Sequence, residues 1–534
     1  MKRYLLLALL LPPAAAALYF ARSGPEVYTA PTAPRTRPPV ARGDHDSPLA
    51  VNLPTLQYWS SQVVYSDLFR QASRWYREDL TTWAWDSGPP LAVDAQGWVT
   101  SLLPNQAASV LIGRGPFGLL PIGSYRVSWD GVGNLDVVGN GAKKGQVGNG
   151  HMEVVIDHLS ASGIQLRLTS TDPANPLRNI RVVPPGVDFT KNPLFHPRFL
   201  ELMKRFRAIR FMDFQRTNNS PVEEWSDRTT PGVAVQTGEA GVCVEHMIAL
   251  CNEVRADGWF CIPHLANDDY VRDFARLLER DMDPELKVFV EYSNELWNGG
   301  FGQAQYAAQK GAQLGLPGSA FQNQLKWGSQ RAVECFDIFR QVFSHSPERL
   351  VCVLAGQSVN PWTGQVVLDH EDAYLHADAY AVAPYFGARL GDPLNAPALL
   401  TMTPAQLEAK LFEDQRDTLA AIDSNVALAA SHGLPLVAYE GGQHLAGLGP
   451  MQNDQALTDL FVSINRSAVM GELYDVYLEF WRDAGAHEMF LWNLADEPSK
   501  FGSWGLLETT NQPIAEAPKW RAVESFVLEN QPWW

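Results

Sequence analysis

The sequence predicts an α/β fold: a (β/α)8 TIM barrel with a β-sandwich insertion between the first and second barrel strands. Two observations predict it. Eight short apolar runs recur along the chain, and most of them follow an amphipathic stretch of helical periodicity. The interval between the first two runs is far longer than one βα unit needs, and it has the turn residues and alternation of antiparallel strands.

Each barrel strand is assigned to one apolar run. The eight runs are LAVNL (49–53), FRAIRFMDF (206–214), GWFCIPHL (258–265), LKVFVEYSNE (286–295), RLVCVLAGQ (349–357), ADAYAVAPYF (377–386), LPLVAYEGG (434–442) and HEMFLWNL (487–494). Helices are predicted at SDLFRQASRWY (66–76), directly after the first run, and before the later runs at 196–205, 244–257, 270–280, 329–343, 419–432 and 458–485. Strands alternating with helices favour a parallel barrel.

The insertion is predicted from alternating runs such as SYRVSWDG (124–131), MEVVIDHL (152–159) and GIQLRLTST (163–171). The resulting division is residues 49–90 as the first βα unit, 91–186 as the inserted β-sandwich and 187–534 as the remainder of the barrel. The division requires LAVNL to occupy the barrel, because otherwise the barrel lacks a strand.

The N-terminal residues resemble an export signal. Lys2 and Arg3 precede an apolar run from Tyr4 to Phe20, and small residues follow. We therefore expect residues 1–23 to be a signal peptide or a signal anchor, and the Pro-rich residues 24–48 to be a linker. The expected location is secreted, periplasmic or at the cell surface, with possible membrane anchoring through the apolar segment.

Composition excludes some partners. The 534 residues include 42 Lys and Arg against 59 Asp and Glu, a formal net charge of −17. Such a balance argues against binding to nucleic acid or to an anionic membrane surface, which needs a basic patch. The five cysteines have no disulfide-framework spacing, and no histidine shows metal-ligand spacing, so no metal or cofactor is expected.

Two glutamates stand at strand ends. Glu295 closes the fourth apolar run and Glu440 closes the seventh. Active sites of α/β barrels lie at the carboxyl ends of the strands, so both side chains are expected in one cavity. Enzymatic cleavage of a glycosidic bond commonly uses a pair of carboxyl groups. The chain has another Asn-Glu pair, Asn252-Glu253, with which Asn294-Glu295 can be compared. That pair lies at a predicted helix end and is interpreted as surface.

With these residues in place, the chain resembles the retaining glycoside hydrolases of clan A, which include the family 5 cellulases and mannanases. That group has an Asn-Glu pair at the end of strand four and a Glu at the end of strand seven, matched here by Asn294-Glu295 and Glu440. The resemblance implies that Glu295 is the acid/base and Glu440 the nucleophile. It further implies substrate-binding or site-supporting roles for residues on strands two, six, eight and three: Arg210, Tyr385, Trp492 and His264.

These carried-over residues have a physical rationale. An amide beside the acid can bond a sugar hydroxyl, and Arg210 is expected to lower the pKa of Glu440 and keep it ionised. The alternatives are that Arg210 pairs with Asp213 or another acid, that Tyr385 belongs to the core and that Trp492 only packs. Loop aromatics offer stacking surfaces for sugars or, equally, packing: Trp297, with Trp59, Trp225, Trp362 and Trp504. Asp213, Gln357 and His444 follow strands and are candidate hydrogen-bonding groups.

The sequence therefore predicts an exported retaining glycoside hydrolase that cleaves β-linked glycans by double displacement, with a polysaccharide or oligosaccharide as its substrate. One alternative is a non-catalytic carbohydrate-binding protein on a degenerate glycosidase barrel, although a binding protein has no need of both glutamates. A second alternative, a metal-dependent barrel hydrolase, is disfavoured because several histidines at strand ends are missing.

Overall fold

The computed structural model describes residues 47–315 and 317–534. The predicted signal segment 1–23 and nearly all of the predicted linker 24–48 lie outside these residues. Ser47 and Pro48 are described, and both are buried where the chain enters the first strand. Within the described residues, none of the helices combines the length and the apolar character needed to cross a bilayer.

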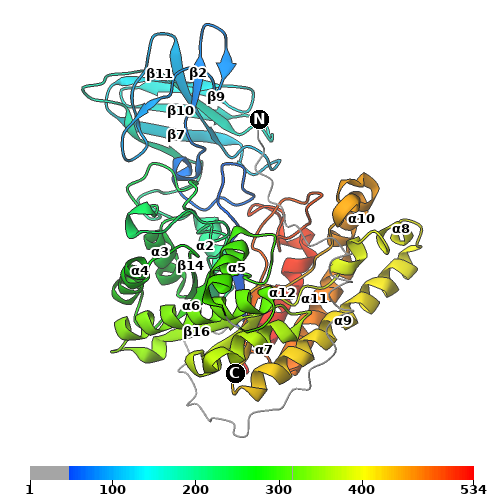
Figure 1. Cartoon of the computed structure of the whole chain (residues 1–534). Helices are drawn as coiled ribbons and strands as arrows, with labels where there is room; N and C mark the ends of the chain where they lie inside the picture. Colours follow the sequence, from blue (N-terminus) through cyan, green and yellow to red (C-terminus); the bar gives the residue numbers. More distant parts are fainter. Residues whose placement is uncertain (1–46, 316) are drawn as a thin grey trace.

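All eight predicted strands form one closed parallel barrel, which is the lower body in Figure 1. Each strand is short and almost wholly buried, as expected for strands covered on both faces. The strands are β1 (Leu49–Asn52), β13 (Ala208–Arg210), β14 (Asp257–Ile262), β15 (Val288–Tyr292), β16 (Leu350–Ala355), β17 (Ala379–Val382), β18 (Leu436–Ala438) and β19 (Met489–Leu491). β1 pairs with both β13 and β19, so LAVNL occupies the barrel as predicted.

Large and small side chains alternate around the barrel interior. Trp259 stacks on Phe289 with 5.5 Å between ring centroids, and Phe490 meets Trp259 edge to face at 4.8 Å. Alanines of other strands line the same interior, including Ala50 and Ala208. The rings of Trp259, Phe289 and Phe490 take up space that the small side chains of neighbouring strands leave in the lumen. The barrel interior is therefore a packed core and not a pore.

The helices cover the outside of the barrel (Figure 1). They are α2 (Pro197–Met203), α3 (Val244–Val254), α4 (Asp268–Asp281), α5 (Gly302–Leu314), α6 (Ala320–Val342), α7 (Pro361–Asp369), α8 (Ala396–Leu399), α9 (Pro404–Ser431), α10 (Gln455–Asn465), α11 (Ala468–Asp483) and α12 (Pro518–Glu529). The predicted helix over 458–485 is two helices, because the chain breaks at Arg466 and Ser467.

The insertion is a β-sandwich of two antiparallel sheets, the upper body in Figure 1. One sheet has the order β12-β7-β10-β9 and the other β3-β2-β6-β11-β8, and their inner faces share one apolar core. The strands are β2 (Tyr76–Asp79), β3 (Ala84–Trp85), β6 (Gln106–Ile112), β7 (Gly123–Asp130), β8 (Gly133–Val138), β9 (Lys143–Gly148), β10 (His151–Ile156), β11 (Ile164–Thr171) and β12 (Arg178–Val183). A separate hairpin is made by β4 (Ala92–Val93) and β5 (Val99–Ser101).

The boundary predicted between the first βα unit and the sandwich is wrong. The sandwich begins at Tyr76 and not at residue 91, because β2 pairs with β6 of the five-stranded sheet. The helix predicted over 66–76 shrinks to the 3-10 turn η1 (Leu68–Gln71). Leu68, Phe69 and Ala72 are buried in the sandwich core, so their helical spacing reflects one apolar turn at the junction and not a barrel helix.

Several barrel loops hold the sandwich in place. The chain passes between the two bodies twice, and the outgoing and returning segments pair where Tyr65 bridges Phe195. The amide of Ala234 donates to Gln96 O at 2.8 Å, and Asn511 Nδ2 donates to Leu119 O at 2.6 Å. Backbone and side-chain bonds from three barrel loops therefore fix the sandwich above the carboxyl end of β1.

The aromatic lumen predicts a large stability cost for its truncation. Phe289→Ala removes a buried ring that contacts Trp259 and Phe490, and we expect a loss of about 3–5 kcal/mol in the free energy of unfolding. Leu528→Ala, at a side chain 74% exposed on α12, is the matched control and should change stability by under about 0.5 kcal/mol. Urea denaturation of the two variants measures both values. Equal midpoints would contradict the assignment of Phe289 to a tightly packed barrel interior.

Candidate active site

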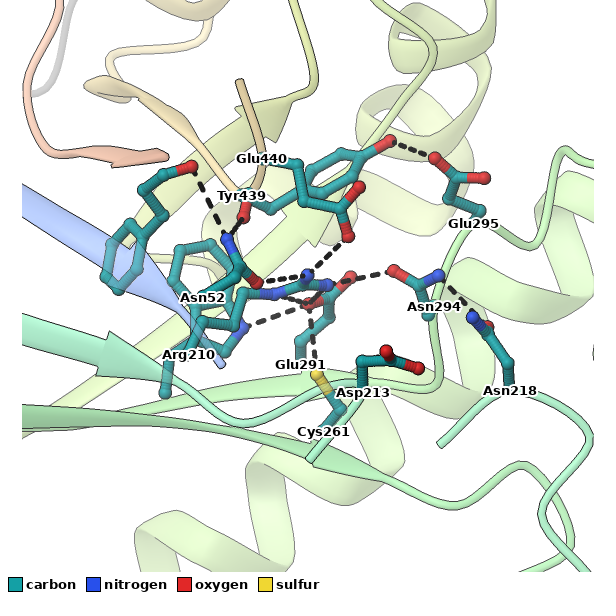
Figure 2. Close-up of polar contacts among 12 residues, drawn as sticks. Asn52, Arg210, Asp213, Asn218, Cys261, Glu291, Asn294, Glu295, Tyr439 and Glu440 are labelled. Carbon is teal, nitrogen blue, oxygen red and sulfur yellow. Dashed lines mark hydrogen bonds and ion pairs between the residues drawn. The ribbon is translucent and has the colours of Figure 1, made fainter. Parts of the chain in front are cut away.

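A buried arginine lies at the centre of the polar cluster in Figure 2. Arg210 is the last residue of β13, and its side chain is 0% exposed. Its guanidinium reaches Glu440 Oε1 at 2.9 Å through Nη1 and Glu291 Oε2 at 2.8 Å through Nη2. Nη1 also donates to Asn52 Oδ1 at 3.2 Å. The strand thus delivers one cation to two carboxylates that come from two other strands.

Glu440 lies two residues beyond the end of β18 and takes hydrogen bonds on both of its oxygens. Arg210 donates to Oε1, and the Tyr385 hydroxyl donates to Oε2 at 2.9 Å. Tyr385 follows β17, so two neighbouring strands bring these groups together. The alternative that Tyr385 is only a core residue is therefore excluded, and Arg210 pairs with both Glu291 and Glu440 and not with Asp213.

Glu295 has a different environment. Tyr439 donates its hydroxyl to Oε1 at 3.1 Å, and Asn298 donates its amide to Oε2 at 2.9 Å. No described cation donates a hydrogen bond to this carboxyl. The backbone φ of Glu295 is +44° and that of Ser293 is +61°, in the left-handed region that non-glycine residues rarely adopt. Such strain is found where a side chain must be aimed into a site.

Asn294 connects Arg210 to the loop after β13. Its Oδ1 accepts from Arg210 Nη2 at 2.9 Å, and its Nδ2 donates to Asn218 Oδ1 at 3.0 Å. Gln303 donates both to Asn218 Oδ1 and to the backbone oxygen of Asn294. The second N–H of the Asn294 amide donates to no described residue, which leaves it available to a ligand.

The charges of this cluster do not balance. Three carboxyl groups, those of Glu291, Glu295 and Glu440, interact with the single guanidinium of Arg210. Burial raises the pKa of Glu440, and the charge of Glu295 adds to the rise, against the pull of Arg210 and the Tyr385 hydroxyl. Burial also raises the pKa of Glu295. Arg210 lowers the pKa of Glu440, as expected, but burial and the charge of Glu295 outweigh it, because one cation does not compensate three buried carboxyl groups.

The two glutamates nonetheless differ in their order of ionisation. Coupled carboxyl groups titrate as a pair, and the site with the better partners ionises first. Glu440 has a guanidinium on one oxygen and a phenol on the other, whereas Glu295 has only an amide and a phenol. The proton that the cluster retains therefore resides on Glu295, and Glu440 carries the negative charge.

The other predicted residues are distributed around this centre. Trp492, directly after β19, is half-buried and packs on the barrel interior. His264 is buried after β14, and its ring meets Tyr306 edge to face, without a hydrogen bond to either glutamate among the described residues. Trp297 is half-buried against the main core. The roles of these three residues in binding remain predictions.

The remaining loop aromatics divide into two groups. Trp504 packs edge to face on Tyr385 at 5.7 Å and on His444 at 4.8 Å, so it borders the site. Trp225 packs on Tyr270 of α4, and Trp362 stacks on Phe321 of α6, so both are packing residues.

Several buried polar atoms close to the strand ends have no partner within the described residues. They are His264 Nδ1, Ser293 Oγ, Trp297 Nε1, His444 Nδ1 and Asn493 Oδ1. Buried polar groups are normally hydrogen-bonded, so each such atom needs an explanation. All five come from loops or strand ends at the carboxyl side of the barrel, where a polyhydroxylated ligand would supply donors and acceptors.

Sequence reasoning missed three residues of this cluster. Glu291 and Asn52 bind the guanidinium of Arg210, and Tyr439 binds Glu295. A signal for Glu291 was present, because it lies two residues after Phe289 on a strand and so shares its lumen-facing side. A charged residue on the inner face of an apolar strand needs a buried partner.

The described residues contain no group of three His, Cys, Asp or Glu side chains arranged to hold a metal ion.

No protein-family model and no curated protein sequence matches this chain. Solved structures do match, and those cited here are glycoside hydrolases. A β-glucuronidase 2 from Bacteroides uniformis has a TM-score of 0.36 and 12% identity, over 86% of this chain and 51% of its own. A cellulase of glycoside hydrolase family 5 from a Bacteroidetes-affiliated source has a TM-score of 0.36 and 12% identity, over 63% of this chain and 85% of its own.

A family 113 β-1,4-mannanase is more distant, with a TM-score of 0.27 and 11% identity over 54% of this chain and 93% of its own. This chain spans about half the length of the β-glucuronidases it matches. At these scores the barrel assignment rests on the strand order and register described above, and family 5 membership is not established.

The charge imbalance predicts a pH dependence of stability. Because burial and mutual repulsion raise the pKa of the Glu440–Glu295 pair in the fold above the ordinary value near 4.5, the pair's stabilising contribution is complete below pH 4.5 and is lost as pH rises through the raised pKa of the pair. Glu440→Gln removes one member of the pair and so reduces that loss. The difference in melting temperature, variant minus wild type, should therefore grow from pH 5 to pH 8 and then level off.

The matched control is Glu529→Gln, which changes an exposed carboxyl at the end of α12. Its melting temperature should follow the wild type at every pH. A Glu440→Gln difference that is constant from pH 5 to pH 9 would contradict a raised pKa for Glu440.

Proposed function

We propose that this protein is a retaining glycoside hydrolase that cleaves β-linked glycans. The observation that carries the proposal is the pair of buried glutamates at the carboxyl ends of β15 and β18 in unlike environments. A retaining glycosidase needs one carboxyl that stays protonated and one that stays ionised. Glu295 and Glu440 fit these two roles in that order, and the resemblance of the sequence to clan A assigns the same roles.

The first chemical step uses both glutamates together. A carboxylate oxygen of Glu440 attacks the anomeric carbon while the bond from that carbon to the glycosidic oxygen breaks. Glu295 gives its proton to the departing oxygen, so the leaving sugar departs as an alcohol. The product is a glycosyl ester of Glu440 and an ionised Glu295.

The second step reverses the roles of the two groups. Glu295 takes a proton from a water molecule, whose oxygen attacks the anomeric carbon and displaces Glu440 as a carboxylate. Two inversions leave the β configuration unchanged. Arg210 and Tyr385 hold the Glu440 oxygens in place throughout, and Asn294 has an amide N–H available for the sugar hydroxyl next to the anomeric carbon.

Other parts of the chain agree with a polymeric substrate. The N-terminal residues predicted as an export signal fit an enzyme that meets polysaccharides outside the cytoplasm. The unpartnered polar atoms at the strand ends fit recognition of sugar hydroxyl groups. We propose that the enzyme is exported and that it needs no metal or organic cofactor for this reaction.

Replacing each glutamate separately tests the two roles. With a panel of neutral β-glycans, Glu440→Gln should lower kcat by at least about 10⁴-fold, because no nucleophile remains. Glu295→Gln should lower kcat by about 10²–10⁴-fold on ordinary glycans and by much less on dinitrophenyl glycosides, whose leaving group needs no proton. Reducing-end release and nitrophenolate absorbance measure the two effects.

Glu253→Gln is the matched control, since Asn252-Glu253 is the other Asn-Glu pair and Glu253 is exposed near the end of α3. It should retain full activity. Hydrolysis that survives Glu440→Gln would refute the nucleophile assignment, and a first product of α configuration by NMR would refute retention. Glycan binding without hydrolysis by the wild type would favour the carbohydrate-binding alternative.

The Tyr385 hydroxyl provides a finer test of the nucleophile. Tyr385→Phe removes the hydrogen bond to Glu440 Oε2 but keeps the ring that packs on Trp504 and His444. We expect kcat to fall by about tenfold, the loss of one charge-assisted hydrogen bond, with little change in KM. A rise in KM at constant kcat would instead place Tyr385 in substrate binding alone.

A further inference from the structure

The outer face of the five-stranded sheet carries side chains that the barrel chemistry does not use. Antiparallel neighbours point to the same side of a sheet, and Trp85 pairs with Glu78, Tyr76 with Ser109, and Ser109 with Arg167. These five residues, with Trp83 in the turn between β2 and β3, define what we call the outer sheet face. Their neighbours on the same strands, such as Val110 and Leu166, are buried in the sandwich core, so the outer sheet face points away from it.

The aromatic residues of this face are exposed and lie close together. Trp85 is 43% exposed, and its ring lies 5.0 Å from that of Tyr76 at an angle of 35°. Trp83, in the turn between β2 and β3, is 71% exposed. Exposed tryptophans are costly for a soluble domain, and clusters of them mark binding sites. Their flat apolar rings match the CH faces of pyranose sugars.

The charges of the face are already compensated. Arg167 pairs with Glu78 at 2.5 Å, and Arg74, whose guanidinium lies 4.4 Å from the Tyr76 ring centroid, pairs with Asp86 at 2.7 Å. Arg167 also lies 5.8 Å from the Trp83 ring centroid. A polyanionic ligand requires cations without carboxylate partners, so paired arginines around aromatic rings favour an uncharged one.

Further aromatic residues join the outer sheet face to the barrel mouth. The hydroxyl groups of Tyr58 and Tyr76 interact electrostatically, and the Tyr58 ring meets Trp59 edge to face at 4.5 Å. Trp59 is 52% exposed and lies in the loop that follows β1. In the same loop, the Thr55 amide donates to Asp213 Oδ2 at 2.8 Å, and Asp213 in turn interacts electrostatically with Arg210.

We propose that the outer sheet face and Trp59 bind an uncharged β-glycan chain and lead it to the cleavage site. The inference rests on the proposed function for the direction of the chain, but the binding itself requires no turnover. We infer an uncharged glycan as the ligand from the exposed rings and the paired charges. Its path towards the cleavage site is inferred from the aromatic contacts that continue to the loop touching Asp213.

Affinity electrophoresis of the full protein in native gels tests the binding. The gels contain barley β-glucan, hydroxyethyl cellulose or konjac glucomannan, with polygalacturonate as the anionic comparison. At least one neutral glycan should retard the wild type. Trp83→Ala and Trp85→Ala should each raise the Kd for that glycan about tenfold, as for a stacked tryptophan at the centre of an interface. Leu528→Ala, an equally exposed apolar residue on α12, should leave the Kd unchanged.

A second set of measurements separates binding from folding and from catalysis. Trp83→Tyr restores a flat ring and should recover most of the retardation. The same tryptophan changes made on the Glu440→Gln chain should weaken retardation equally. Where the wild type hydrolyses a glycan, the KM of Trp83→Ala should rise more for the polymer than for a disaccharide of the same sugar.

The outcomes that overturn the proposal are specific. They are no retardation of the wild type by any neutral glycan, tryptophan variants that bind like the wild type, or stronger retardation by polygalacturonate than by every neutral glycan. A change of oligomeric state in Trp83→Ala by gel filtration, with unchanged retardation, would make the face an interface between copies. Tryptophan-dependent retardation without any hydrolysis would refute the catalytic proposal alone and leave this one standing.

Discussion

A single buried guanidinium holds the strand ends of this barrel in one arrangement. Arg210 binds Glu291 of β15, Glu440 after β18 and Asn52 of β1, so four strands meet at one cation. Removing such a group would leave buried carboxylates uncompensated, which costs more than the pair contributes when intact. The loss of Arg210 or of one of its carboxylate partners is therefore expected to destabilise the whole cluster. The aromatic lumen lies beneath this cluster and supports it. Trp259 is part of that lumen and donates its indole N–H to Glu291.

The position of Arg210 also makes the two candidate catalytic carboxyl groups different. Burial raises the pKa of both, and the difference between them comes from their hydrogen-bond partners. Glu440 receives the guanidinium because it follows β18, which only β1 and β19 separate from β13 in the closed barrel, whereas Glu295 is turned towards Tyr439 by its left-handed backbone. Glu295 and Glu440 thus differ in their tendency to ionise because they follow different strands and have different backbone conformations.

Much of this arrangement could be predicted from the sequence, for identifiable reasons. A parallel strand buried on both faces is a continuous apolar run, so all eight strands were visible, and the polar residue that ends each run had to lie at the carboxyl edge. Glu295 and Glu440 were found in that way, whereas Arg210 and Tyr385 were predicted through the resemblance to clan A. Glu291 was missed because it lies inside a run and not at its end, and its role depends on which face of β15 it occupies.

The first connection was mispredicted for a different reason. The spacing of Leu68, Phe69 and Ala72 suits a helix, but a single turn satisfies it when those side chains enter a neighbouring core. Propensity alone does not distinguish one helical turn from three. The lowering of the Glu440 pKa by Arg210 was predicted, but the net rise was not, because it depends on the burial of the site and on how many carboxyl groups surround one arginine, and no single motif shows either.

The site of the insertion has a mechanical consequence. The chain leaves β1 at its carboxyl end and re-enters the barrel before α2, and Tyr65 bridges Phe195 where the two crossings pair. Bonds from the loops after β13 and β19 add two further attachments, at Ala234 and Asn511. A body held at three places has little freedom to rotate, so its outer sheet face keeps a fixed direction relative to Arg210 and the two glutamates. A long, stiff ligand gains from such fixed geometry because fewer degrees of freedom are lost when it binds both parts at once. A sandwich joined by a flexible linker would not give that advantage, which is a physical reason for placing it inside the first βα loop.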